Sequence, residues 1–108
     1  MIFCWDSWNR EHVASHSVSR DDAVFVIRHA GPPFPEPVGG GKYRVWGVSG
    51  GGRLVQVVFA FRSPELMEYD EMTYDDIVNL ESGAGPYIYI VHARCLTLSE
   101  KRSLRKRR

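Results

Sequence analysis

Residues 42–61, KYRVWGVSGGGRLVQVVFAF, decide the fold class because they contain the clearest pair of strands in the chain. Two runs rich in β-branched and aromatic residues are separated by three glycines. Such runs favour strands, and glycines between them are typical of a hairpin, here with a loop longer than the tightest type. We therefore expect KYRVWGVS and RLVQVVFAF to pair antiparallel.

Two helices are expected before this hairpin. Asp6 or Ser7 can cap the first, through NREHVASH, because a short side-chain acceptor satisfies an otherwise unpaired amide. Ser19 can cap the second, and the sequence GPP that begins at Gly31 ends it. The whole stretch 31–41, GPPFPEPVGGG, is predicted to be a loop, since proline has no backbone donor.

The remaining elements complete a single α+β domain over residues 1–108. IFCW at 2–5 and YIYIVHAR at 87–94 are predicted strands, and TYDDIVNLE at 73–81 is predicted to be a short helix. Thr97 and Glu100 form a T-x-x-E capping box before a last helix, EKRSLRK. The order predicts a mostly antiparallel sheet with two N-terminal helices and one C-terminal helix.

The composition is ordinary for a folded domain, with 44% apolar and 25% charged residues. No apolar run approaches the roughly 20 residues that cross a bilayer, and the amino terminus lacks a secretory layout. We therefore expect a cytoplasmic protein. Cys4 and Cys95 are expected to be buried and reduced, while a disulfide between them stays open as an alternative.

The net charge of +1 conceals a segregation of charge along the chain. The basic tail, residues 101–108, holds six of the fourteen Lys and Arg residues, whereas 63–93 holds none. An acidic insertion, about 62–86, contains seven of the thirteen acidic residues. This pattern permits a face for a polyanion, and equally an internal attraction between the insertion and the tail.

Three stretches share the order and spacing of one known family. They are WDSWNREHVASHSVSRDDA at 5–23, KYRVWGVSGGGRLVQVVF at 42–59 and IYIVHARCLTLSEKRSLRK at 88–106. Together they resemble the BrnT toxins, RelE-like proteins of bacterial type II toxin–antitoxin pairs. The chain departs from that family in its longer acidic insertion, and in Trp8, Ser15 and Ser17, where many members carry Lys, Lys and Gly.

The resemblance implies a RelE-like fold and an endoribonuclease that needs neither metal nor cofactor. It also implies two partners, RNA and a BrnA-like antitoxin of the ribbon-helix-helix, DNA-binding type, in a dimer or a toxin–antitoxin hetero-oligomer. The competing interpretation is a non-catalytic RelE-like binding module that has lost nuclease activity, and the departures favour it. A DNA-binding protein acting alone is a poorer fit, because no basic helix carries a recognisable turn motif.

Metal-free RNA cleavage uses the 2′-hydroxyl as nucleophile and requires a base, an acid and cations. His92 and Arg94, two apart on a predicted strand, share a face and supply a proton-transfer group and a phosphate-binding fork. The alternative is that both extend into solvent from the face of Ile88 and Ile90. Arg53, at the start of a neighbouring strand, is the third catalytic candidate, or else pairs with the acidic insertion.

Further basic residues are candidates for binding RNA or for supporting the site. The candidates for binding the RNA backbone are Lys101, Arg102, Arg105 and Arg44. His12 and His16 are one helical turn apart and are either structural, packed beside Trp5 or Trp8, or catalytic. Two imidazoles without a third ligand do not indicate a metal site.

Overall fold

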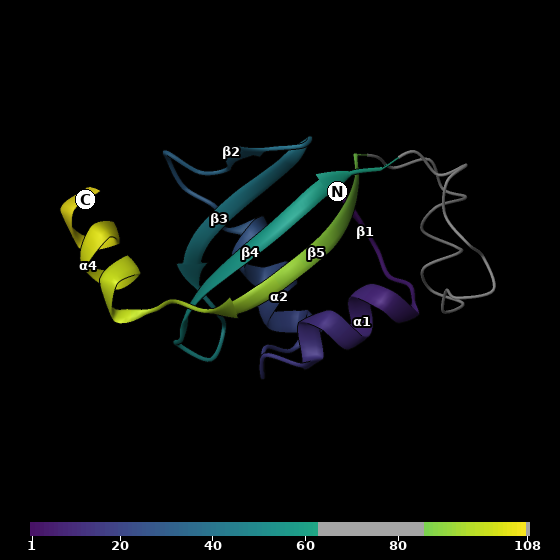
Figure 1. Cartoon of the computed structure of the whole chain (residues 1–108), viewed down its shortest axis with the longest axis horizontal. Coiled ribbons are helices and arrows are strands. Elements are labelled where there is room, and N and C mark those ends of the chain that lie inside the picture. The colour runs from purple at the N-terminus through teal and green to yellow at the C-terminus, as the bar shows by residue number, and fades with distance from the viewer. Residues whose placement is uncertain (63–85, 108) are drawn as a thin grey trace.

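The structure, a computed structural model, describes residues 1–62 and 86–107, so the helix predicted at 73–81 lies outside the described residues. The sheet order is β1-β5-β4-β3-β2; β1 and β5 are parallel and the other pairs antiparallel. Three helices and this five-stranded mixed sheet confirm the α+β prediction (Figure 1). The elements are β1 (Ile2–Cys4), α1 (Ser7–Ala14), α2 (Arg20–Arg28), β2 (Glu36–Gly39), β3 (Lys42–Val48), β4 (Leu54–Phe61), β5 (Tyr87–Cys95) and α4 (Leu98–Arg107).

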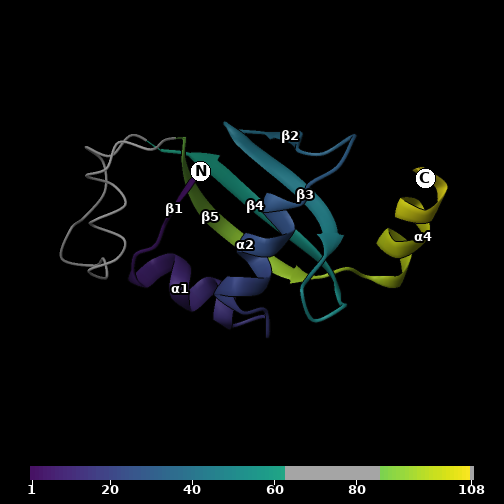
Figure 2. The ribbon, with the colours of Figure 1, turned by 180° about the vertical axis from the view of Figure 1, so that it is seen from behind.

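The register of the central strands sorts their side chains onto two faces of the sheet, because residues opposite one another point the same way. α2 covers one face, which we call the core face (Figure 2). The other face, called the open face, is turned toward the viewer in Figure 1. Its cross-strand rows are Lys42–Ala60–Tyr89, Arg44–Val58–His92 and Trp46–Gln56–Arg94.

A β-bulge in β5 decides which side chains reach the open face. The β4–β5 register shifts by one residue, and Val91 is the extra residue in β5. The bulge changes the alternation, so that Ala93 joins Ile90 in the core while His92 and Arg94 lie on the open face. The two isoleucines of β5 therefore do not share the face of His92 and Arg94, and that expectation was wrong.

The proline-rich stretch predicted to be a loop contains an edge strand. β2 pairs antiparallel with β3, with Glu36 opposite Arg44 and Pro37 opposite Tyr43. An edge strand needs ladder donors on one side only, so a proline is tolerated there. The loop prediction was therefore wrong for Glu36–Gly39.

Both amino-terminal helices begin at predicted caps. The Asp6 carboxylate accepts from the Asn9 amide at 3.0 Å, and the Asn9 side chain accepts from the Asp6 amide at 2.8 Å. Ser19 Oγ accepts from the Asp22 amide at 3.0 Å. Each bond satisfies an amide that has no partner within its helix.

A buried polar network attaches α1 to the sheet. Asn9, fully buried, donates to the Cys4 carbonyl at 2.9 Å. The Tyr89 hydroxyl donates to the Asp6 carboxylate at 2.9 Å. Burial and this bond to Asp6 raise the pKa of Tyr89, which keeps the hydroxyl protonated as a donor. The α1 cap is thereby joined to both β1 and β5.

The main core lies between α2 and the core face. Val26 and Ile27 of α2 pack there with Val45 and Val57 of the hairpin. Gly47 of β3 allows this close contact, since a Cβ at that position would lie 3.3 Å from Val26 Cγ1, closer than an ordinary van der Waals contact. A side chain at position 47 would therefore require Val26 to shift.

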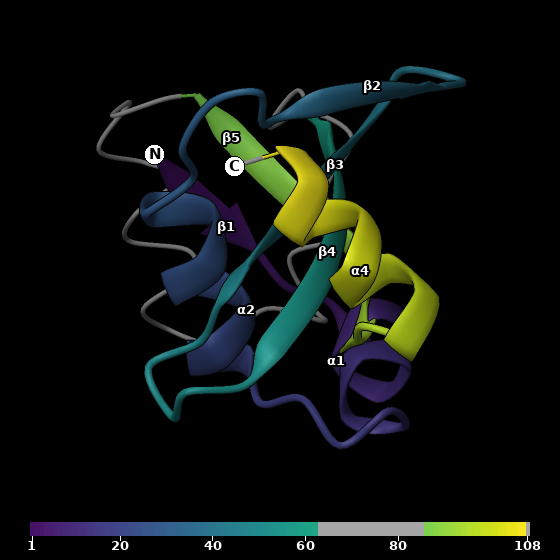
Figure 3. The same cartoon turned by 90° about the vertical axis from the view of Figure 1, so that its left-hand side faces the viewer.

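The last helix begins at the predicted capping box. Glu100 accepts from the Thr97 amide at 2.8 Å, and Thr97 accepts from the Glu100 amide at 3.2 Å. Leu104 of α4 packs with Trp46 and Leu96, at the end of the sheet that faces the viewer in Figure 3. No helix of the described residues is both long and apolar enough to cross a membrane.

The two cysteines differ in exposure. Both are thiols, but Cys4 is buried in β1 whereas Cys95, the last residue of β5, is exposed. The expectation of two buried thiols was therefore right for Cys4 only.

We expect Asn9→Ala to lower the free energy of unfolding by about 2 kcal/mol or more, since it leaves the Cys4 carbonyl and the Asp6 amide without their partner. Urea denaturation measures the change. Ser15→Ala, which removes an exposed bond from Ser15 Oγ to the His12 carbonyl, is the matched control, with an expected change within about 0.5 kcal/mol. Equal losses in the two variants would contradict the assigned role of Asn9.

Candidate active site

Two histidines from distant parts of the sequence meet at the edge of the open face. His16 follows the end of α1, and His92 lies just after the bulge of β5. Their ring centroids are 5.1 Å apart, with an interplanar angle of 68°. A pair of imidazoles at this separation can act on a single small group, one as base and the other as acid.

The pKa of His92 is lowered from its ordinary value of 6.5. Burial is the largest cause, followed by the charges of His16, Arg94 and His12, each of which disfavours a second proton nearby. His92 is therefore mainly neutral at neutral pH, the form that accepts a proton. This state suits a general base.

Two rings of α1, in the two turns before His16, stack on each other. Trp8 and His12, one turn apart, stack with ring centroids 3.7 Å apart, and His12 Nδ1 donates to the Trp8 carbonyl at 2.9 Å. The Trp8 ring is also 6.4 Å from that of Tyr89 on β5. His12 thus packs beside Trp8, which was one of its expected roles.

Arg44 lies in the same cross-strand row as His92, with Val58 between them. Two strand spacings separate the two residues, about 10 Å. The Arg44 guanidinium lies 4.8 Å from the centre of the Trp46 ring, and its Nη2 is 3.5 Å from a Glu36 carboxylate oxygen. This contact with Glu36 is long, so Arg44 keeps capacity for a stronger acceptor.

Arg94 lies on the same face of the sheet as His92, as predicted, but its guanidinium is already paired with a carboxylate. Its two terminal nitrogens donate to both carboxylate oxygens of Glu100, at 2.6 and 2.8 Å. The bond to Arg94 lowers the pKa of Glu100 to about 2, so that the pair stays ionised at neutral pH. Arg94 therefore holds the start of α4, and a phosphate must compete with Glu100 for it.

Arg53 lies at the corner where the β3–β4 hairpin meets the α1–α2 turn. It donates to the Ser17 carbonyl at 2.7 Å and pairs with Asp22 at 3.4 Å. Ser17 has a positive φ of 60°, uncommon for a residue with a side chain. Arg53 thus supports the turn that carries His16 and does not share a row with His92.

The basic candidates of the last helix are exposed. Lys101, Arg102 and Arg105 lie on α4, which contacts the open face through Leu104 and Trp46. The structure therefore brings together His16, His92 and His12, and leaves the cations of α4 at the end of the sheet.

The sequence alone does not reveal the contact between His16 and His92. Both residues were candidates, but sequence spacing cannot show that residues 76 positions apart are neighbours, because that contact depends on the path of α1 along β5. The stacking of Trp8 and His12 could be expected from their spacing, because residues four apart lie on the same face of a helix.

Comparison of the chain with protein-family models, with curated proteins and with solved structures gave no match.

We expect His16→Gln to raise the pKa of His92 toward 6.5, because it removes a charge that opposes protonation. The measurement is a titration of the histidine ring protons by NMR. His29→Gln, at the end of α2, is the control and leaves the pKa of His92 unchanged. An unchanged pKa in His16→Gln would show that the two rings are not close in solution.

We expect the ion pair of Glu100 and Arg94 to stabilise the fold only where Glu100 is ionised. The pKa of Glu100 is lowered on folding, so its contribution is complete above pH 4.5 and is lost as the pH falls toward 2. The stability difference between wild type and Glu100→Gln, from urea denaturation at several pH values, should shrink over that range. A difference independent of pH would contradict the pairing.

Proposed function

We propose that this protein is a metal-independent endoribonuclease, the cytoplasmic toxin of a type II toxin–antitoxin pair with a RelE-like fold. The observation that carries the proposal is the His16–His92 pair at 5.1 Å, together with the lowered pKa of His92. The resemblance of three stretches to the BrnT toxins supports the same reading, and it makes a BrnA-like antitoxin the expected partner.

In the proposed reaction, neutral His92 accepts the proton of a 2′-hydroxyl as its oxygen attacks the adjacent phosphorus. His16, in its protonated form, gives a proton to the departing 5′-oxygen. The products are a 2′,3′-cyclic phosphate and a free 5′-hydroxyl, so the proton taken at one imidazole is balanced by the proton given at the other.

Cations stabilise the charge that develops on the phosphorane. Arg44 is the candidate within the His92 row, and Arg53 supports the turn of His16. Lys101, Arg102 and Arg105 of α4 would neutralise neighbouring phosphates of the same strand. Arg94 contributes only when RNA displaces Glu100 from it.

The second candidate function is a binding module without nuclease activity. The observation that favours it is that two arginine side chains are already paired with carboxylates: Arg94 with Glu100 and Arg53 with Asp22. On this reading, the open face binds a partner and the histidines only fill the edge between α1 and β5.

We expect purified wild-type protein to cleave single-stranded RNA in the presence of EDTA. His92→Ala and His16→Ala should each lower the cleavage rate about 10²- to 10⁴-fold, the usual contribution of one general acid or base. His29→Ala is the matched control and keeps the wild-type rate, because His29 is an exposed histidine at the C-cap of α2. Gel analysis and end-group analysis for a cyclic phosphate measure the outcome.

Absence of cleavage by wild type, with and without ribosomes, would contradict the nuclease proposal and leave the binding module as the remaining candidate function. Cleavage that survives in both histidine variants would show that another group performs the proton transfers.

A further inference from the structure

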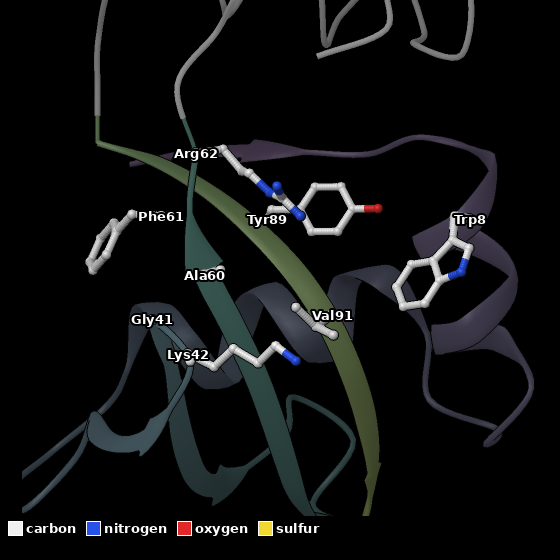
Figure 4. Close-up of a pocket in the computed structure, with 9 residues that line it drawn as sticks. Trp8, Gly41, Lys42, Ala60, Phe61, Arg62, Tyr89 and Val91 are labelled. Atoms are coloured by element: carbon white, nitrogen blue, oxygen red, sulfur yellow. The ribbon is translucent and has the colours of Figure 1, made fainter. Parts of the chain in front are cut away.

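A pocket of about 470 Å³ lies on the open face next to the histidine pair. Such a volume is in the usual range for a small-molecule site, about 300–1,000 Å³. The lining residues come from α1, the β2–β3 turn, the start of β3, the end of β4 and the first half of β5, and include Trp8, Lys42, Phe61, Arg62, Tyr89 and Val91 (Figure 4).

The walls of the pocket combine two exposed aromatic residues, Trp8 and Phe61, with two cations, Lys42 and Arg62. Trp8 is 46% exposed, whereas Val13 of the same helix is buried. The Arg62 guanidinium is held 4.5 Å from the centre of the Tyr89 ring, and the Lys42 side chain extends toward Val91 (Figure 4). An aromatic wall, an apolar floor and two cations suit a planar ring that carries an anionic group.

Two elements that line the pocket also carry or lead to the candidate catalytic histidines. Along α1, the Trp8 ring stacks on that of His12 with centroids 3.7 Å apart, and His16 follows four residues later, in the turn after the helix. Along β5, Val91 lines the pocket and the next residue is His92. On the proposed function, an RNA strand whose phosphate lies at the histidines would place a neighbouring nucleotide beside this pocket.

We propose that this pocket is the subsite for one nucleotide of single-stranded RNA next to the scissile phosphate. The base stacks on Trp8, and its phosphate lies between Lys42 and Arg62. Stacking on an exposed indole accepts any base, so the subsite contributes affinity more than sequence preference. This inference rests on the proposed nuclease function, but it concerns binding and is tested apart from cleavage.

The test uses a mixed-sequence 2′-O-methyl RNA octamer, which lacks the 2′-hydroxyl nucleophile and cannot be cleaved. Its affinity is measured by fluorescence anisotropy at several salt concentrations. We expect Trp8→Ala to weaken binding about tenfold or more, and Trp8→Phe to retain most of it. Lys42→Ala and Arg62→Ala should each reduce the slope of log affinity against log salt by about 0.7.

The chain offers matched controls on the other side of the sheet. Phe25 on α2 stacks on His29 at 4.0 Å, as Trp8 stacks on His12, and is 39% exposed. Phe25→Ala should therefore leave RNA affinity unchanged, and so should Arg28→Ala, which removes an exposed cation of α2. Far-UV circular dichroism checks that each variant is folded. If Trp8→Ala does not fold, Trp8→Phe still tests the role of the aromatic ring.

Wild-type affinity in Trp8→Ala, or an equal loss in Phe25→Ala, would overturn the subsite. Loss in the two cation variants alone would also overturn it, since that pattern describes a phosphate-binding patch without a base. The two proposals fail separately: RNA cleavage by wild type with unchanged binding in Trp8→Ala removes only the subsite. Binding through Trp8 without any cleavage removes only the nuclease.

Discussion

The carboxylate of Asp6 is the group on which the candidate site depends. It caps α1 through the Asn9 amide and accepts the hydroxyl of Tyr89 from β5. Asn9, fully buried, completes the connection by donating to the Cys4 carbonyl of β1. Removing any of these partners leaves a buried polar group unsatisfied, which costs about 1–3 kcal/mol. The direction of α1 along β5, and with it the place of His16, is therefore fixed at the first turn of the helix.

The bulge at Val91 supplies the other half of the arrangement. In a regular strand, His92 would point to the same side as Ile90, and the core would have to accept an imidazole and a guanidinium. The extra residue lets β5 bury Ala93 and turn His92 and Arg94 to the open face. The histidine pair thus needs two independent features, a capped helix and a bulged strand, which meet only in the folded chain.

The sequence predicts the local features well because their causes are local. The caps at Asp6, Ser19 and Thr97 each depend on residues within three positions, and the central hairpin depends on its own side chains. The bulge and the edge strand β2 were not predictable, since both depend on pairing with a neighbour. The same holds for the site: His16 and His92 were separate candidates, and only the tertiary fold makes them a pair.

On the proposed function, the Arg94–Glu100 pair links RNA binding to the position of α4. Glu100 both caps α4 and occupies the Arg94 fork, so a phosphate that draws Arg94 away removes one of the bonds that orient the helix. Such a linkage is reciprocal. A contact that stabilises the Arg94–Glu100 pair weakens the binding of a phosphate by Arg94, and a bound phosphate weakens the pair. A partner protein that packs against α4 and keeps Glu100 in place would therefore lower the affinity for RNA without covering the histidines. If the proposed function holds, this contact would give an antitoxin a route to neutralise the nuclease.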